Sequence, residues 1–219
     1  MVNFAEKTNR MSLSLSKIVL SNAGKRFNKE WIFKGVNQVF LPKQQYAIIG
    51  SNGSGKSTLL QTISSSMSLS AGQLEWHNAA VINPDQIHQY FAIATPYLEL
   101  IEEMSALEFL SFHSQFKPLL SVVNINEILN IIGLQKNANK KIRQYSSGMK
   151  QRLKLAQAIF SDTPVLLLDE PCTNLDKDGY ALYHALIQMY CKDKIVIICS
   201  NDEAEISFCS ERIHINDYK

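Results

Sequence analysis

The chain has 219 residues, of which 46% are hydrophobic and 19% are charged, as expected of a soluble globular domain that carries a smaller subdomain. Its 22 basic and 20 acidic residues leave a net charge of only +2. Because no basic stripe stands out along the sequence, we expect no nucleic-acid partner.

Neither a membrane span nor a secretion signal is visible in the sequence. No apolar run is long enough to cross a bilayer, and the polar stretch Met1–Arg10 lacks the apolar core of a signal peptide. The four cysteines form no CxxC pair, and a chain of this size does not depend on disulfides, so reduced thiols are expected. We therefore expect a cytoplasmic protein, to which another chain would supply any membrane part.

In chain order, the first elements alternate between apolar and polar residues. Leu13, Leu15 and Val19 alternate with polar residues, and Val36 and Phe40 are separated by mostly polar residues in the same way. This alternation predicts half-exposed antiparallel strands near the N-terminus.

Three later apolar runs, at residues 46–49, 165–168 and 195–199, each lead into a polar loop. Continuous apolar runs of this length suit strands that are buried on both faces of a parallel sheet. In such sheets the reactive groups lie just beyond the carboxyl ends of the strands, so we expect these three loops to form the site.

Between the first and the second of these apolar runs, a helical pattern interrupts the core. Ser105 and Glu108 form a capping box, and Gly133 closes a second short helix at 126–132. The predicted fold is α/β. It has a core with a mostly parallel sheet and an N-terminal antiparallel part (12–94 and 162–219), and an inserted α-helical subdomain (95–161).

The loop after the first apolar run, from Gly50 to Ser57, matches the phosphate-binding pattern G-x-x-x-x-G-K-[S/T] of a P-loop, so the predicted core is a P-loop NTPase core. Its glycines let backbone N–H groups point at phosphate oxygens, and the following helix adds its positive dipole end. Lys56 can reach the β- and γ-phosphates, and the Ser57 hydroxyl can bind Mg²⁺. A chance glycine-rich turn is the alternative, but the motif lies between a strand and a helix, as its function requires. The predicted ATP-binding residues of this loop are Gly50, Ser51, Asn52, Gly53, Ser54, Gly55, Lys56, Ser57 and Thr58.

Two carboxylates follow the second apolar run. Asp169 can hold Mg²⁺ through its water shell, and Glu170 can orient and deprotonate an attacking water. Alone they could be two solvated loop residues, but their place after a buried strand, in a chain with a P-loop, favours the catalytic interpretation.

The segment 145–152, Tyr-Ser-Ser-Gly-Met-Lys-Gln-Arg, resembles the signature motif of ATP-binding cassette (ABC) proteins, usually written Leu-Ser-Gly-Gly-Gln. Ser146 and Gly148 match this motif, whereas Tyr145, Ser147 and Met149 depart from it in the manner of bacterial export-type cassettes. From the residues alone, this is a Ser/Gly cap whose helix, at 149–160, favours an anion at its start. The resemblance implies that the anion is the γ-phosphate of ATP held by a second protomer.

Further resemblances cover most of the chain. Residues 173–176 resemble the loop that crosses the dimer interface in this family, and Phe27 resembles the aromatic that stacks on adenine. Trp31 competes for that role, and an ordinary core aromatic is an alternative for both.

Two positions depart from the family. Its glutamine should lie near residues 95–97, yet no glutamine occurs between Phe91 and Met104, and its histidine falls on Asn201. The Asn201 amide could donate a hydrogen bond to the γ-phosphate, or it could cap a helix beginning near Glu203.

Taken together, the resemblance implies an ATPase that uses ATP and Mg²⁺, with Glu170, Lys56 and Asn201 as catalytic residues and Ser57 and Asp169 as metal ligands. It implies a head-to-tail dimer with a second copy or a related cassette, and an integral membrane permease docked at the helical insertion, on the cytoplasmic face of the inner membrane. The compact length is similar to that of haem-exporter (cytochrome c maturation) subunits. Three alternatives remain: a soluble cassette ATPase, a P-loop small-molecule kinase, which the signature disfavours, and a nucleotide switch that scarcely hydrolyses.

Overall fold

The computed structural model describes residues 13–219; the polar stretch Met1–Arg10, on which the argument against a secretion signal rests, lies outside the described residues. The strands are β1 (Lys17–Phe27), β2 (Glu30–Phe40), β3 (Gln45–Ile49), β4 (Ala71–His77), β5 (Phe91–Ala94), β6 (Val165–Asp169), β7 (Ile195–Cys199) and β8 (Glu211–His214). The α-helices are α1 (Lys56–Ile63), α2 (Ala106–Phe116), α3 (Ile125–Ile131), α4 (Ser147–Ile159), α5 (Lys177–Tyr190) and α6 (Glu203–Ile206). Short 3₁₀ helices are η1 (Pro84–Gln89), η2 (Gln135–Asn137), η3 (Ile142–Gln144) and η4 (Ile215–Tyr218).

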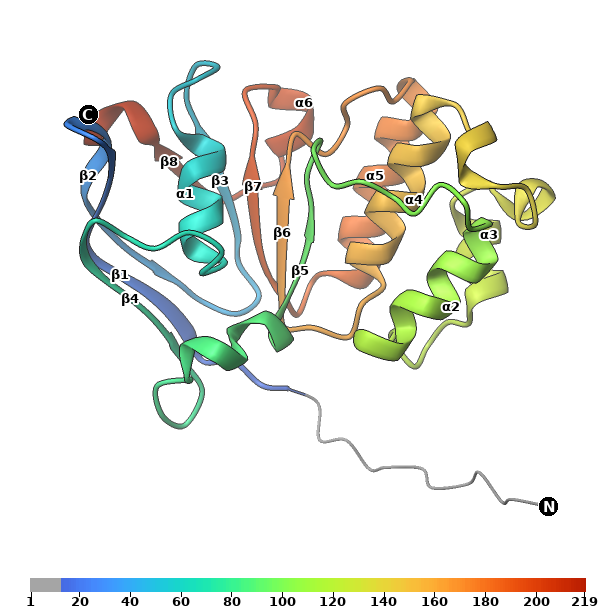
Figure 1. Ribbon diagram of the computed structural model, residues 1–219, viewed down its shortest axis with the longest axis horizontal. Coiled ribbons are helices and arrows are strands. Elements are labelled where there is room, and N and C mark those ends of the chain that lie inside the picture. The colour runs from blue at the N-terminus through green and yellow to red at the C-terminus, as the bar shows by residue number, and fades with distance from the viewer. Residues whose placement is uncertain (1–12) are drawn as a thin grey trace.

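The strands form two sheets. Strands β2, β1 and β4 make an antiparallel sheet in that order, and β5, β6, β7, β3 and β8 make a sheet whose neighbours are all parallel (Figure 1). The predicted α/β fold, with a parallel core and an antiparallel N-terminal part, is confirmed.

The alternation at Leu13, Leu15 and Val19 predicted the wrong set of buried residues for β1. Ile18 and Leu20 are buried in the core, whereas Val19 is only partly buried. The predicted alternation began at Leu13 and Leu15, which precede the strand, so it did not follow the pleat of β1 itself.

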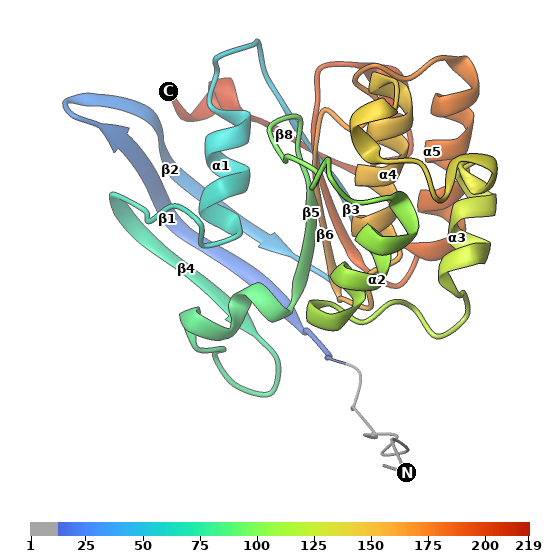
Figure 2. The ribbon, with the colours of Figure 1, turned by 45° about the vertical axis from the view of Figure 1, so that its right-hand side comes forward.

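The parallel sheet is the middle layer of the molecule, which explains its continuous apolar runs. Every residue of β6 and β7 is buried, and successive side chains enter different cores. Leu166 packs with residues of α4 and α5 on one face, whereas Leu167 packs with α1 and the antiparallel sheet on the other. Figure 2 shows α1 between the two sheets, with α4 and α5 beyond the parallel strands.

Helices α2, α3 and α4 follow one another between β5 and β6. Ser105 and Glu108 form the predicted capping box of α2, with reciprocal hydrogen bonds of 3.2 and 2.7 Å. The next helix starts at Ile125 rather than at the predicted residue 126, because Asn124 and Glu127 form a second capping box. The assignment of 95–161 as a separate subdomain stays a prediction.

Within the part of the chain that the structure describes, no helix combines the length and the apolar character that a membrane span needs. All four cysteines, Cys172, Cys191, Cys199 and Cys209, are buried free thiols.

Candidate nucleotide site

The order of the parallel strands brings the three predicted loops together. Strand β7 lies between β6 and β3, so the loops that follow these strands are neighbours at one edge of the sheet. Two backbone hydrogen bonds join them: Glu170 N–H donates to the Cys199 carbonyl at 2.9 Å, and Ser200 N–H donates to the Ile48 carbonyl at 3.2 Å. The P-loop and the carboxylate pair therefore belong to one site.

Neighbouring side chains lie so close to the P-loop backbone that two positions require glycine. A Cβ on Gly50 would lie 2.4 Å from Ile215 Cγ2, and a Cβ on Gly55 would lie 2.4 Å from Ile32 Cγ2. Gly55 also has a φ of +104°, in the region that residues with a side chain avoid. It precedes α1 and makes no side-chain cap, so the first N–H groups of this helix have no capping side chain.

Lys56 lies folded against the P-loop. The residue is 5% exposed, and its Nζ donates to the Gly50 carbonyl at 2.7 Å and to the Ser51 carbonyl at 3.3 Å. Carbonyl oxygens are weaker partners for an ammonium group than phosphate oxygens are. The lysine therefore occupies the loop in a position from which an anion could capture it.

Asp169, at the end of β6, has the features of a cation ligand. The residue is 4% exposed, and its Oδ1 atom has no hydrogen-bond partner among the described residues. Burial raises the pKa of Asp169 and the neighbouring Glu170 charge adds to the rise, while the Ser57 hydroxyl and the charge of Lys56 oppose it. A partnerless buried carboxylate oxygen beside a serine hydroxyl is a donor set that fits Mg²⁺, which prefers oxygen ligands.

Glu170 has a backbone conformation that is rare for a residue with a side chain, with a φ of +44°. A short turn holds it there, because its carbonyl accepts from Thr173 N–H at 3.2 Å and from Thr173 Oγ1 at 3.0 Å. Its side chain lines a cavity of about 320 Å³ together with Asn201. A carboxylate placed in this way could accept a proton from a water molecule in the cavity.

Asn201 contacts the P-loop directly. Its Oδ1 accepts from Gly50 N–H at 3.1 Å, and its Nδ2 donates to Asn52 Oδ1 at 3.3 Å. The alternative prediction that Asn201 caps the next helix is wrong, since Asp202 caps α6 and accepts from Ala204 N–H at 2.9 Å.

The structure does not bring Ser146 and Gly148 to the P-loop. Ser146 caps α4, which starts at Ser147 rather than at the predicted residue 149, and its Oγ accepts from Met149 N–H at 3.3 Å. The adjacent cavity of about 400 Å³ is lined by the start of α4 and by the loop at 174–176. Helices α1 and α4 pack against opposite faces of the parallel sheet (Figure 1).

The two candidate adenine-stacking aromatics differ in their surroundings. Phe27 is 47% exposed at the end of β1, with Lys25 Nζ 5.3 Å from its ring centroid. Trp31 is less exposed and has two cations over its ring, Arg26 at 5.5 Å and Lys34 at 5.2 Å. Phe27 therefore has the freer ring, although its role stays a prediction.

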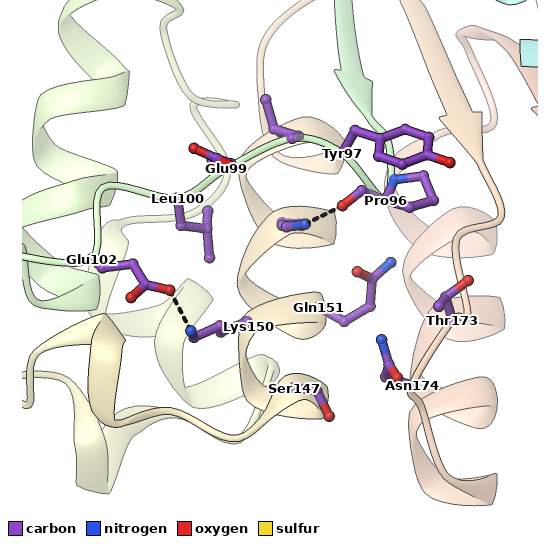
Figure 3. Close-up of a pocket in the computed structure, with 12 residues that line it drawn as sticks. Pro96, Tyr97, Glu99, Leu100, Glu102, Ser147, Lys150, Gln151, Thr173 and Asn174 are labelled. Atoms are coloured by element: carbon purple, nitrogen blue, oxygen red, sulfur yellow. Dashed lines mark hydrogen bonds and ion pairs between the residues drawn. The ribbon is translucent and has the colours of Figure 1, made fainter.

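The segment where the family glutamine is missing borders a larger cavity of about 650 Å³ (Figure 3). Pro96 and Tyr97 lie on one side of it, and α4 lies on the other. Lys154 Nζ donates to the Pro96 carbonyl at 2.9 Å, and Tyr97 is 86% exposed. A lysine on α4 thus holds the backbone of this segment.

Sequence reasoning missed two buried polar residues that hold the loop after Glu170. Gln151 Nε2 donates to the Pro171 carbonyl at 2.6 Å, and Glu205 Oε1 accepts from Cys172 N–H at 2.8 Å. Gln151 lies within the signature segment, so its position was a usable signal. Glu205 gave no signal, because in the sequence it is indistinguishable from the exposed Glu203 on the same helix.

A parallel sheet with this phosphate-binding loop before α1, and an Asp–Glu pair after a nearby strand, defines a P-loop ATPase. Residues 33–173 match the family model described as "ABC transporter". The chain belongs to this family and is one of its ATP-binding, ATP-hydrolysing proteins.

Individual relatives agree with this assignment. The chain is 30% identical over 207 residues to "Uncharacterized ABC transporter ATP-binding protein YybJ" of Bacillus subtilis (strain 168), which covers 91% of this chain and 92% of the relative. It is 27% identical to "Lantibiotic transport ATP-binding protein SrtF" of Streptococcus pyogenes, over 91% of this chain and 83% of the relative. Other relatives are named for import.

Solved structures share the fold. A "Putative ABC transporter (ATP-binding protein)" from Pyrococcus furiosus superposes with a TM-score of 0.79 at 21% identity, over 93% of this chain and all of that one.

Proposed function

We propose that the chain is the nucleotide-binding subunit of a membrane exporter and that it hydrolyses Mg²⁺-bound ATP at the P-loop. The observation that carries the nucleotide site is Asp169, whose partnerless buried Oδ1 lies in a site shared with Ser57 and Lys56. Ser57 and Asp169 would hold Mg²⁺, and Lys56 would turn from the Gly50 carbonyl to the β- and γ-phosphates.

Glu170 supplies the general base in this proposal. It accepts a proton from the attacking water, whose oxygen forms a bond to the γ-phosphorus while the bridging oxygen leaves with ADP. Mg²⁺ when bound neutralises charge on the β- and γ-phosphates. Asn201 touches Gly50 and Asn52, so its amide group is placed to donate to the same phosphate.

A second copy, or a related cassette, would complete the site. Because α1 and α4 lie on opposite faces of the sheet, Ser146 and Gly148 of the same chain are not available to the bound nucleotide. We propose a head-to-tail dimer in which these residues of one copy bind the γ-phosphate held by the P-loop of the other.

A membrane permease would dock at the helical segment 95–161, on the cytoplasmic face of the membrane. The cavity between Pro96 and α4 supports this proposal, because it offers a hollow beside the exposed Tyr97 to an element of another chain. The signature variant from Tyr145 to Met149 supports export, and SrtF, a relative of similar length, is named for transport of a lantibiotic.

A nucleotide switch that turns over slowly is the second candidate. It is favoured by Asn201, which cannot carry a positive charge, and by the lack of glutamine between Phe91 and Met104.

Phosphate release by the purified chain at saturating ATP, with Mg²⁺ or with EDTA, tests the proposal. We expect repeated turnover that requires Mg²⁺ and a loss of that turnover in Asp169→Asn with ATP still bound. A full rate in EDTA would contradict the proposed metal site, and a single turnover per chain would favour the switch.

A further inference from the structure

Glu205, on α6, is a buried carboxylate to which the proposed mechanism gives no task. The residue is 3% exposed, its Oε1 accepts from Cys172 N–H at 2.8 Å, and its Oε2 has no partner among the described residues. An acid in such a place costs folding free energy. A buried residue of this kind calls for a reason beyond packing.

The bond from Glu205 reaches the turn that carries Glu170. Cys172 lies inside this turn, between Glu170 and Thr173. The backbone N–H and the hydroxyl of Thr173 both donate to the Glu170 carbonyl. Gln151 also holds this turn, because its side-chain amide donates to the Pro171 carbonyl. Since the φ of Glu170 is +44°, its conformation depends on these surrounding contacts.

Glu205 also connects this turn to the loop after β7. Its own backbone N–H donates to the Asp202 carbonyl at 2.9 Å, and its carbonyl accepts from the buried Tyr183 hydroxyl at 3.1 Å. Glu205, Glu170 and Asn201 all line the same cavity of about 320 Å³. A shift of the Glu205 side chain would therefore move the turn that carries Glu170 relative to the loop that carries Asn201.

We propose that Glu205 is a positioning residue for ATP hydrolysis, whose side-chain oxygen holds Cys172 N–H and thereby keeps Glu170 directed at the attacking water. This inference rests on the proposed role of Glu170 as general base. The hydrogen bond from Cys172 N–H needs an acceptor atom at the distance of the Glu205 carboxylate, so the length of the side chain matters more than its charge. Burial raises the pKa of Glu205, in keeping with a contact that does not depend on the charge.

Two substitutions separate length from charge. Glu205→Gln keeps the length and an acceptor oxygen, and we expect it to retain most of the wild-type kcat. Glu205→Asp keeps the charge but shortens the reach, and we expect kcat to fall by about 10- to 100-fold, as misplacement of a catalytic group by about 1 Å does. Fluorescent-nucleotide titration should show ATP affinity unchanged in both, since neither touches the P-loop.

Glu203 supplies the matched control, because it is an exposed glutamate on the same helix, paired with Arg212 at the surface. Glu203→Gln and Glu203→Asp should leave kcat and ATP affinity at wild-type values.

A wild-type kcat in Glu205→Asp would overturn the inference, and so would equal losses in the Asp and Gln variants. Glu170→Gln, assayed beside them, separates this failure from that of the proposed function. If Glu170→Gln turns over at the wild-type rate, the general base is misassigned and the inference falls with it. If only the Glu205 variants lack an effect, the general base stands and the positioning role does not.

Discussion

Helices α1 and α4 both present N-terminal N–H groups that could bind an anion, yet their starts are built differently. Helix α1 follows Gly55, which makes no side-chain cap, and its first residue is the buried Lys56. Helix α4 follows Ser146, whose hydroxyl already accepts from Met149 N–H at 3.3 Å on an exposed part of the surface.

This difference indicates two different tasks. The start of α1 has N–H groups without a side-chain cap and a lysine that donates to two carbonyl groups, so we propose that it binds phosphate within its own chain. The start of α4 has part of its N–H groups satisfied and faces outward, so it is suited to an anion presented from outside. Because the parallel sheet lies between the two helices, we propose that one chain supplies two half-sites and no complete one.

Removing the cation from the start of α1 should have the largest effect. Lys56→Ala should weaken ATP binding by roughly 100-fold, since a charge-assisted contact with phosphate is lost, and turnover should vanish with it. Calorimetry with Mg²⁺ measures this change. Lys43→Ala, which removes an exposed lysine paired with Asp193, is the control and should bind ATP normally. Near-wild-type affinity in Lys56→Ala would contradict the assignment of the P-loop.

Glu170→Gln should stabilise the dimer in which the two half-sites meet. We expect ATP binding to persist while turnover falls by about 10²–10⁴-fold, the usual cost of losing a general base. The variant should therefore accumulate as an ATP-bound dimer, which light scattering at saturating ATP would detect. A monomer under these conditions would argue against the paired site.

Substitution at the start of α4 tests the other half. Ser146→Arg should place a large side chain where the phosphate of the other copy belongs, so ATP binding should persist while turnover falls by about 100-fold. Ser146→Ala removes only the cap and should lower stability by about 1 kcal/mol or less. Wild-type turnover in Ser146→Arg would show that an anion does not bind at this helix.

Asn201 should give the smallest effect. Asn201→Ala loses the contacts with Gly50 and Asn52, and we expect hydrolysis to slow by about 3- to 10-fold with ATP affinity little changed. Asn201→His, which can carry a positive charge, should turn over at an equal or higher rate. Steady-state ATPase rates decide, and unchanged turnover in Asn201→Ala would mean that the side chain does not act on the phosphate.

The sequence predicted the parts of the fold that depend on strong local patterns. The apolar runs at 165–168 and 195–199 suited strands of a covered sheet, and the P-loop motif predicted the adjacent helix. The capping box at Ser105 and Glu108 likewise needs only local contacts.

Features that depend on tertiary contacts could not be predicted. Asn201 and Asp202 are both good capping residues, and only the placement of the P-loop beside β7 determines that Asp202 caps α6. Glu203 and Glu205 have the same chemistry, and only the packing of α6 buries one and leaves the other in solvent. The distribution of the two half-sites over opposite faces of the sheet is also a property of the assembled fold.

A mixing experiment tests most directly the central claim that one site needs the start of α1 from one copy and the start of α4 from another. Lys56→Ala and Ser146→Arg should each be inactive alone. A mixed dimer, however, contains one complete site, with the P-loop of the Ser146→Arg copy facing the intact Ser146 of the Lys56→Ala copy. An equal mixture should therefore recover roughly a quarter of the wild-type ATPase rate, because half of randomly paired dimers are mixed and each has one complete site of two. A mixture that hydrolyses ATP no faster than the separate variants would contradict the account.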